Sequence, residues 1–425
     1  MTVEARAHRG VKRAIGLAAA LLAACWIIAG CGSSKQKDGA QIRGSTLSVY
    51  SSVPLHGASR LNAQAVVNGE NLALSQIHYR LGRYRIVFKS LDDSTAQRSE
   101  WDPGQTTINA KLAAQDPTTI GYIGEFNSGA SAISIPILNR LQIPQVSPTS
   151  TAVGLTSNGP GSAPGEPEKY YPTGIRTFAR VVPSDAVQGQ AQVRMQESEG
   201  CTKTYVLDDG EVDGHDGATS FGLAAQHSPI KVVGNDTFDP KASDYSSLAK
   251  TIASTGANCV FISAITESNA VTVTKQIAAA LPHVRLFGSA GVAESTFTDA
   301  SQGGIPGTLD ARVLISVPTL DLSAYPESAQ AFYSAYTRTY GPPQPYAIYG
   351  YEAMSLMLSA IARGTDGGRG PALRSKVVHE LFATHERHSV LGTYSIEPDG
   401  DTSLRRFGAY RIVGGRLSFW RVIDA

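Results

Sequence analysis

The sequence predicts an α/β fold made of two similar lobes, each built on a mostly parallel sheet. Two series of short apolar runs alternate with segments of helical period, a pattern typical of βαβ units. The first series begins at residue 46 and the second at residue 178. Between them, residues 154–172 are rich in Gly and Pro, which indicates an exposed surface loop. The repeated rhythm favours two lobes over one large sheet.

The first series supplies four strands and three helices. Asp102, Pro103 and Gln105 have the pattern of an N-cap, a first-turn proline and a capping-box partner, so a helix should begin there. The predicted strands cover residues 47–50, 85–91, 120–124 and 143–146, and the predicted helices cover residues 60–77, 103–115 and 130–141.

The second series continues the same pattern and then changes. Its predicted strands cover residues 178–182, 204–207, 230–233, 260–263, 284–288 and 313–317, with helices starting at residues 184, 216, 244 and 268. Three longer helical segments follow at 323–340, 346–363 and 371–384, and strand-like segments at 389–396, 407–413 and 417–422 end the chain. We therefore assign residues 45–177 and 319–388 to lobe I, and residues 178–318 and 389–425 to lobe II.

The first 30 residues have the features of a lipoprotein signal peptide. A basic segment ends at Arg13, and the apolar run at 14–29 is too short for a comfortable membrane span. Residues 28–34 resemble a bacterial lipobox, which makes Cys31 the lipidated first residue of the mature protein. Cys25 has a similar local pattern, but the apolar run continues beyond it; an uncleaved signal anchor is the alternative. We expect residues 31–44 to form a flexible tether on the extracytoplasmic face of the cell membrane.

Composition describes an ordinary soluble globular body. Apolar residues make up 42% and charged residues 17% of the 425-residue chain. Residues 1–30 contain one acidic and four basic residues, so their removal changes the formal charge from +1 to −2. This balance implies no nucleic-acid partner.

Two polar loops, one βα unit apart, form the candidate binding site. Asn127 and Ser128 follow the apolar run at 120–124, and Ser150 and Thr151 follow the run at 143–146. Small ligands bind outside the carboxyl ends of the strands in open α/β sheets. The hydroxyls and nearby backbone N–H groups should therefore meet in one crevice. The alternative is that these residues only cap the helices that follow.

Two cysteines of the body, Cys201 and Cys259, each precede a predicted strand. These two strands are neighbours if the sheet has the doubly wound order 2-1-3. An oxidising compartment would then favour a Cys201–Cys259 disulfide. Two buried free thiols are the alternative.

Together these residues resemble the type I, or leucine/isoleucine/valine-type, periplasmic solute-binding proteins of ABC transporters. The resemblance extends from about residue 45 to 424, and residues 54–57, 68–69, 90–93, 123–128, 143–148 and 178–185 carry it. It implies two Rossmann-like lobes joined by a three-stranded hinge, which close over a small solute. It also implies a membrane permease as partner; we further expect a monomer with no cofactor and no enzymatic activity.

The resemblance assigns roles to Ser128, Ser150 and Thr151, which match the positions that bind the carboxylate and ammonium of an amino acid in the family. The chain departs from the family at three positions: Asp213 replaces an aromatic residue, Ala290 replaces the ammonium-binding acid, and Asn62 stands where an aromatic residue often closes the pocket. A polar solute is therefore more reasonable than a leucine-like one.

The missing acid at position 290 needs a substitute, because a buried unpaired ammonium is unfavourable. Asp213 and Glu267 both follow strands of the second lobe and are the candidate ligand-binding acids; Glu294 is a weaker candidate. A helix-capping role is the alternative for Asp213.

The sequence lacks the usual enzyme motifs, including phosphate-binding glycine loops and the nucleophile elbow. His385 and His388 lack a third spaced ligand, so no metal site is predicted. The sequence therefore favours a lipid-anchored solute-binding component of an ABC importer. A ligand-sensing ectodomain of a signalling receptor is the main alternative, and a hydrolase on the same scaffold is a more distant one.

Overall fold

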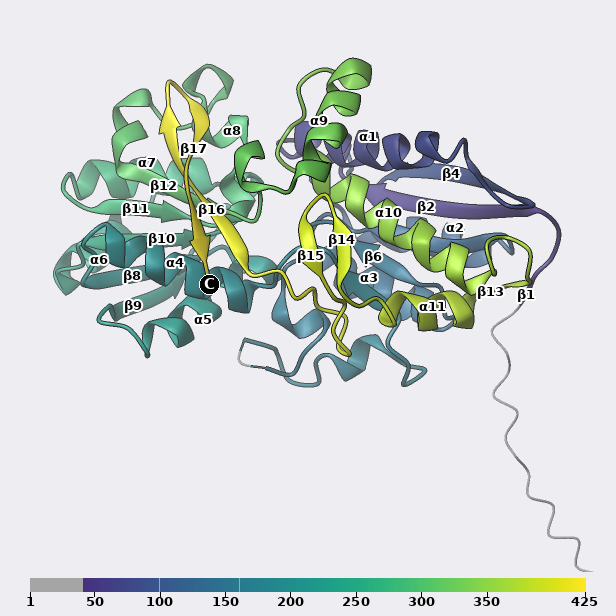
Figure 1. Cartoon of the computed structure of the whole chain (residues 1–425). Coiled ribbons are helices and arrows are strands. Elements are labelled where there is room, and N and C mark those ends of the chain that lie inside the picture. The colour runs from purple at the N-terminus through teal and green to yellow at the C-terminus, as the bar shows by residue number, and fades with distance from the viewer. Residues whose placement is uncertain (1–40, 99, 160) are drawn as a thin grey trace, which may run out of the picture. The chain divides into compact units, whose positions relative to one another are not determined.

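The computed structural model describes residues 41–98, 100–159 and 161–425, which contain two large sheets and their surrounding helices (Figure 1). The predicted signal peptide, Cys31 and the predicted tether up to residue 40 lie outside the described residues. The end of the expected tether is structured, because β1 (Gln41–Ile42) pairs with β13 (Ala372–Leu373). Ile42 is 3% exposed and belongs to the core.

The first sheet has the order β3-β4-β2-β5-β6-β7. All its strands run parallel except β3, which pairs antiparallel with β4. The strands are β3 (Arg80–Leu81), β4 (Tyr84–Asp92), β2 (Thr46–Val53), β5 (Thr119–Gly124), β6 (Gln145–Ser147) and β7 (Phe178–Arg180). Its helices are α1 (Arg60–Gln76), α2 (Pro103–Gln115), α3 (Ser128–Asn139), α9 (Glu327–Tyr340), α10 (Ala347–Gly364) and α11 (Arg374–Phe382).

Alternate residues of β2 face two different helical layers, as the period of two in a strand requires. Val49 joins the apolar core that includes Val66 of α1 and Met357 of α10. Tyr50, the next residue, packs instead with Ala113 of α2 and Leu138 of α3. The first sheet is thus buried between these two layers.

The second sheet has the order β17-β16-β12-β11-β10-β8-β9. The strands β9 (Lys231–Thr237), β8 (Lys203–Asp208), β10 (Cys259–Ser263), β11 (Arg285–Gly288) and β12 (Val313–Val317) are parallel, and β16 (Arg406–Val413) and β17 (Arg416–Asp424) are antiparallel additions. Its helices are α4 (Asp185–Ser198), α5 (Val212–Ala225), α6 (Ser246–Thr255), α7 (Ala270–Ala280) and α8 (Ser295–Thr298). The predicted 2-1-3 order is present as β9-β8-β10.

The same alternation positions the helices of the second sheet. Val206 of β8 packs with Phe221 of α5, whereas Leu207 belongs to the core that includes Ile252 of α6 and Val273 of α7. Both large sheets therefore have the layered α/β arrangement that the sequence predicts, with mostly parallel strands.

The chain passes between the two sheets three times. It leaves the first sheet after β7 and returns after β12, since α10 packs against β5 and β6. It crosses again after the short hairpin of β14 (Arg387–Ser389) and β15 (Gly392–Tyr394) and ends in β16 and β17. These are the three crossings expected from the sequence.

Three local predictions differ from the structure. The strand at residue 178, predicted to open the second series, is β7 of the first sheet, where it pairs with β6, so the chain leaves the first sheet after this strand and not before it. Helix α5 begins at Val212 rather than at residue 216, which places Asp213 in its first turn. The segment 154–172 is only partly exposed, since Leu155, Tyr170 and Tyr171 pack against Phe178. Its two 3-10 helices, Val153–Leu155 and Glu168–Tyr170, bring these side chains into the core, a tertiary effect that Gly and Pro content does not reveal.

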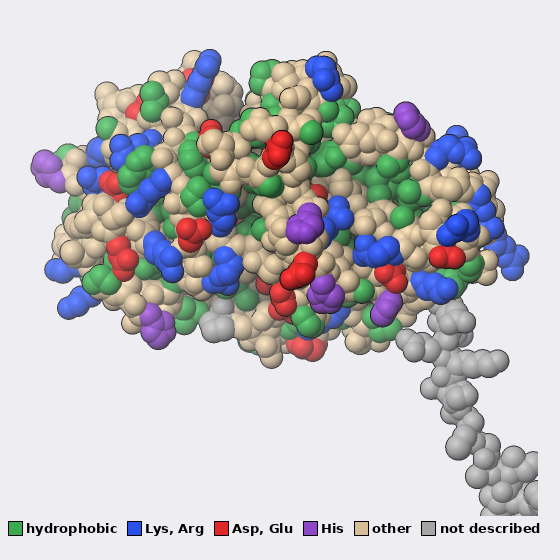
Figure 2. All heavy atoms as spheres, viewed as in Figure 1, with side chains coloured by type: hydrophobic (Ala, Val, Ile, Leu, Met, Phe, Trp, Pro, Cys, Tyr) green, Lys and Arg blue, Asp and Glu red, His purple; other side chains and the backbone are tan. Residues whose placement is uncertain are grey.

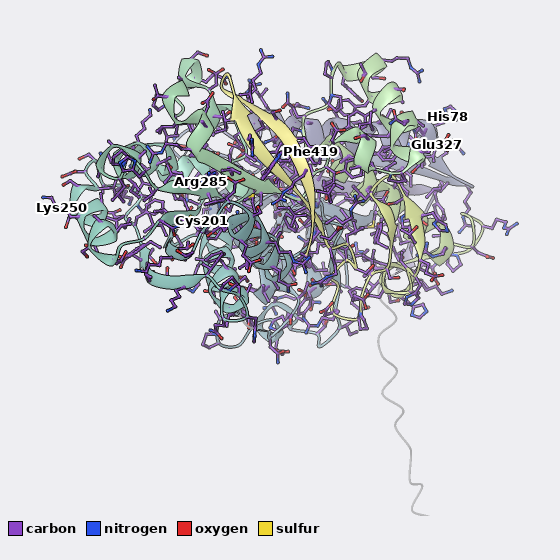
Figure 3. All side chains as sticks on the ribbon, turned by 60° about the vertical axis from the view of Figure 1, so that its left-hand side comes forward. His78, Cys201, Lys250, Arg285, Glu327 and Phe419 are labelled. Carbon is purple, nitrogen blue, oxygen red and sulfur yellow. A yellow bond between two sulfur atoms is a disulfide. The ribbon has the colours of Figure 1, made fainter. Side chains whose placement is uncertain are left out.

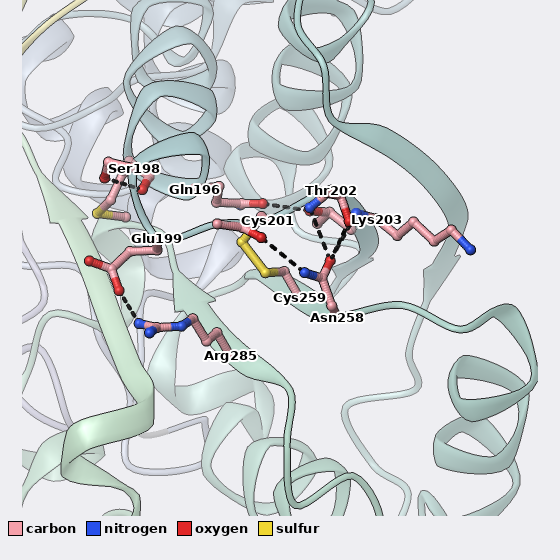
Figure 4. The surroundings of a disulfide bond; sticks show 12 residues. Gln196, Ser198, Glu199, Cys201, Thr202, Lys203, Asn258, Cys259 and Arg285 are labelled. Carbon is pink, nitrogen blue, oxygen red and sulfur yellow. Dashed lines mark hydrogen bonds and ion pairs between the residues drawn. A yellow bond between two sulfur atoms is a disulfide. The ribbon is translucent and has the colours of Figure 1, made fainter.

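Cys201 and Cys259 form a disulfide, with their Cα atoms 5.8 Å apart (Figure 4). The bond joins the loop before β8 to the first residue of β10, at the amino ends of two paired strands. Arg285 forms an ion pair with Glu199 beside this disulfide (Figure 4). Figure 3 shows Cys201 and Arg285 close together within the second-sheet part, whereas the exposed Lys250 lies at its outer edge.

The described residues show no concentration of one charge on the face in Figure 2, where acidic and basic side chains are interspersed. No helix among them has the length and apolar character needed to cross a bilayer. No group of three or more His, Cys, Asp or Glu side chains in this part of the chain is arranged to hold a metal ion.

Candidate functional site

A small cavity lies where the carboxyl ends of strands from both sheets meet. The loops after β2, β5 and β6 line one side, and the segments after β8, β10 and β11 line the other. Its lining residues are Ser59, Phe126, Asn127, Ser128, Thr149, Thr151, Asp213, Ile265, Ala290, Gly291, Glu294 and Tyr346. This is the edge at which α/β sheets bind small ligands.

Ser128 connects the two first-sheet loops at this site. Its Oγ accepts hydrogen bonds from the backbone N–H groups of Thr151, at 3.1 Å, and Ala152, at 3.2 Å. These two bonds occupy the acceptor capacity of the hydroxyl, so its proton is left to donate. Ser128 is 2% exposed and is among the lining residues, which gives it a polar hydrogen to offer to a bound molecule.

Ser150 lies behind the cavity rather than in its lining. Its Oγ is 2.8 Å from Ser131 Oγ and donates to the Glu125 carbonyl oxygen at 3.1 Å. The adjacent Thr149 is a lining residue and its Oγ1 donates to the Phe126 carbonyl oxygen at 2.7 Å. Successive residues of the loop therefore differ in role: Ser150 supports the loop, whereas Thr149 and Thr151 border the cavity.

Arg180 of β7 fixes the loop that carries Thr151. Its guanidinium is fully buried, donates to the carbonyl oxygens of Ser150 and Ala152, and forms an ion pair with Asp401 at 2.7 Å. A planar group with five donors can hold several carbonyls in one geometry, which explains the choice of Arg.

Asn127 lines the cavity and has an acceptor atom without a partner in the part of the chain that the structure describes. It is the N-cap residue of α3, but its side chain does not cap the helix. Among the described residues, its Oδ1 has no hydrogen-bond partner although the side chain is only 9% exposed. Phe126, the preceding residue, packs edge-on against Tyr346 with ring centroids 5.7 Å apart.

The second sheet contributes two acids to the lining, Asp213 and Glu294. Burial raises the pKa of Asp213 well above its usual range, and the negative charges of Asp209, Asp185 and Glu211 add to the rise. Burial likewise raises the pKa of Glu294 well above its usual range, with Glu267 adding to the effect. Glu294 is 7% exposed, and its Oε2 has no hydrogen-bond partner among the described residues.

Glu267 joins the two sides instead of facing the cavity. Its Oε1 accepts hydrogen bonds from Ser59 N at 3.1 Å and from Ser59 Oγ at 3.0 Å. Ser59 precedes α1 in the first-sheet part, whereas Glu267 follows β10 in the second sheet. Glu267 is not among the described residues that line the cavity, so the acid ranked lower by sequence, Glu294, takes the lining position.

Sequence reasoning missed Ser59, Thr149 and Tyr346 as lining residues. The turn after the first strand was a signal for Ser59, which lies just beyond it at the start of a helix. Tyr346 comes from the start of α10, far away in sequence, and no local pattern indicates its position.

A larger hollow lies between α4 and α5, lined by residues of these helices and the turn after α5, including Val193, Ser220 and Leu223. Its walls contain no strand ends. It therefore lacks the convergence of loops that characterises the cavity described above.

The chain resembles known binding proteins in both sequence and fold. Residues 51–406 match the family described as periplasmic binding protein. Among solved structures, the leucine binding protein LivK from Thermotoga maritima superposes with a TM-score of 0.75 at 19% identity, covering 89% of this chain and 99% of that one. No curated protein matches the sequence significantly.

Two further structures have the same fold. The branched-chain amino acid binding protein LivJ from Streptococcus pneumoniae, in complex with isoleucine, has a TM-score of 0.71 at 16% identity and covers 89% of this chain and 100% of its own. A solute binding protein from R. palustris in complex with benzoate has a TM-score of 0.66 at 20% identity, with 89% and 96% coverage.

The chain belongs to the periplasmic binding protein family, the solute-binding proteins of ABC transporters. Its fold is the mixed α/β fold of the type I members, with mostly parallel sheets, which confirms the fold predicted from the sequence. The family and fold are those of substrate-binding proteins that are not enzymes.

Proposed function

We propose that this protein is the extracytoplasmic solute-binding component of an ABC importer, attached to the cell membrane through a lipid on Cys31. The solute is a small polar compound, an amino acid or a related molecule. One observation carries the proposal: a cavity between the loops of two sheets is lined by buried polar groups from both sides, some of them without partners among the described residues. Most buried polar atoms in proteins have hydrogen-bond partners, and at this cavity a bound molecule can supply them.

The arrangement supports a capture mechanism. The first-sheet loops offer the Ser128 hydroxyl and the polar side chains of Asn127, Thr149 and Thr151 to an entering solute. Contacts from Asp213 and Glu294 then complete the enclosure. Because these contacts exist only when both sides meet, they favour the closed form over the open one. The closed form would then dock, as a monomer, on the membrane permease.

Solute binding can be tested on the purified body, residues 31–425, by thermal shift against amino acids, small amides and aromatic acids. A solute at about 100 times its dissociation constant adds roughly 2.7 kcal/mol to the free energy of unfolding. Stabilisation by a narrow set of related compounds supports the proposal. The absence of any stabilisation, together with no small molecule released on denaturing the purified protein, contradicts it.

Import can be tested in cells that lack the protein. Uptake of the identified solute at low concentration should fall and should return when the protein is restored. A Cys31→Ser variant should restore less uptake, because it cannot be lipidated. Normal uptake in the deletion strain would remove the transport assignment even if solute binding stands.

A further inference from the structure

The charge of the cavity lining is unbalanced. Asp213 and Glu294 line it, whereas no Lys, Arg or His occurs among the described lining residues. The Arg98 guanidinium lies 3.8 Å from Glu211, outside the lining, and it also pairs with Glu100. In a closed cavity with two carboxyl groups and no basic side chain, the carboxyl groups are neutralised either by protons, which their raised pKa values favour, or by a cation that the bound molecule supplies.

Two buried oxygen atoms of residues that line the cavity have no hydrogen-bond donor among the described residues. Glu294 Oε2 and Asn127 Oδ1 are both more than nine-tenths buried, and both lack a partner among the described residues. Both are acceptors. Leaving them without a donor is unfavourable, so the bound molecule should supply N–H or O–H groups at both points.

Nearby acids strengthen the negative potential. Asp209 is 4% exposed and accepts hydrogen bonds from the backbone N–H groups of Ile265 and Glu211. Glu267 accepts its two hydrogen bonds from the neutral Ser59. Neither acid is paired with a cation in the described contacts. Burial raises the pKa of these two carboxyl groups and of those of Asp213 and Glu294, and a cation bound between them would favour their ionised forms.

The two acids exclude several solute classes. An aromatic monoacid, like the benzoate bound by one structural relative, would bring a further negative charge. A neutral amino acid has one ammonium, which can balance one carboxylate but leaves the second. A solute with an additional cationic nitrogen balances both and supplies several donors.

We propose that the solute carries net positive charge, as a basic amino acid or an amine with an ammonium, guanidinium or amidinium group, and that Glu294 and Asp213 bind its cationic nitrogen atoms. This inference rests on the proposed function and specifies its substrate class. Glu294 would bind the ammonium group in place of the acid that is missing at Ala290, and Asp213 would supply a second carboxylate.

Matched solute pairs test the charge requirement directly. L-lysine and L-norleucine have similar shapes and differ in the terminal ammonium, and L-arginine and L-citrulline differ in the guanidinium charge. Titration calorimetry should give at least about tenfold tighter binding for a cationic member than for its neutral partner. Putrescine and agmatine extend the test to amines without a carboxylate.

Variants identify the residues. Glu294→Gln should weaken binding of the cationic solute by about 10- to 100-fold, and Asp213→Asn should weaken it in the same direction. Both variants should also reduce the preference for the cationic member of each solute pair over its neutral partner. Glu327→Gln, at an exposed position outside the cavity, is the matched control and should leave affinity unchanged (Figure 3). Two acids are tested separately, so a folding defect in one variant does not prevent the test.

The outcomes separate this inference from solute binding itself. If norleucine, citrulline or benzoate binds as tightly as every cationic solute, the charge inference is overturned while solute binding stands. If none of the cationic solutes binds, the inference is also overturned, and the compound extracted from denatured protein then decides the proposed function.

Discussion

Ser128 holds two loops together through one side-chain oxygen. Because its Oγ accepts from the buried N–H groups of both Thr151 and Ala152, Ser128→Ala leaves two donors without an acceptor. We expect the free energy of unfolding to fall by about 1–3 kcal/mol. Urea denaturation measures this. Ser131→Ala is the comparison: it leaves one buried donor, Glu125 N–H, without an acceptor and should therefore lower stability less. An unchanged midpoint for Ser128→Ala would show that these bonds do not stabilise the loops.

Asp185 should make stability depend on pH. Burial raises its pKa to about 8, and the negative charge of Asp216 adds to the rise. An unfolded aspartate has a pKa of about 3.9, so the folded state binds more protons between about pH 4 and pH 8. The contribution of Asp185 to stability is therefore complete below pH 4 and is lost as the pH rises through 8.

Asp185→Asn should make the free energy of unfolding less dependent on pH. The variant should lose less stability than the wild type between pH 4.5 and pH 8, since the amide does not ionise. Denaturation curves at several pH values would show a shallower decline. Parallel declines in the two proteins would mean that Asp185 does not titrate in this range.

Residue roles at the site were only partly predictable from sequence. The position of a loop after a strand indicated Asn127, Ser128 and Thr151, which all line the cavity. The sequence could not show that Thr149 rather than Ser150 faces it, because neighbouring hydroxyls of an irregular loop have no fixed alternation. Nor could it rank Glu294 above Glu267, because that choice depends on which acid meets Ser59.

At the scale of elements, the apolar pattern predicts the parallel strands and their order. The disulfide at the amino ends of β8 and β10 allows a direct test of how much that strand pair is stabilised. Cys201 and Cys259 are 58 residues apart, so their bond closes a long loop of the unfolded chain. Chain-entropy reasoning gives a stabilisation of about 2–4 kcal/mol. Reductant should therefore lower the denaturation midpoint of the wild type.

The double variant Cys201→Ser, Cys259→Ser is the control for this measurement. Its midpoint should match that of the reduced wild type and should not respond to reductant. If full reduction, verified by thiol titration, leaves the wild-type midpoint unchanged, the bond does not stabilise the paired strands.

Element boundaries and buried loops were the least predictable parts of the fold. The start of α5 was placed too late because the run at 208–214 is rich in Asp and Gly, which are common in turns. The segment 154–172 has the composition of a surface loop, yet its tyrosines pack against Phe178. Composition describes local preference, whereas this burial comes from tertiary contacts with α3, which lies earlier in the chain, and with β7, which follows the segment.

At the scale of the whole molecule, the account depends on closure over the cavity. The Ser59–Glu267 hydrogen bonds join the two sides in the described arrangement, so they should stabilise the closed form. Glu267→Ala should weaken solute affinity by about 1–3 kcal/mol although Glu267 itself does not line the cavity. Ser59→Ala removes only the hydroxyl donor and should weaken it less.

Small-angle scattering separates closure from binding in these variants. With saturating solute, the radius of gyration of the wild type should decrease, and the Glu267→Ala protein should need more solute for the same decrease. An identical solute dependence in both proteins would exclude a role for this contact in closure.

The most direct measurement is a crystal structure of the protein with its solute bound. The account predicts that the solute lies between the loops after β5 and β6 and the segments after β8 and β11, within hydrogen-bond distance of Ser128 Oγ and the Glu294 carboxyl group. A solute bound in the hollow between α4 and α5, with the cavity between the sheets filled by protein side chains, would contradict it.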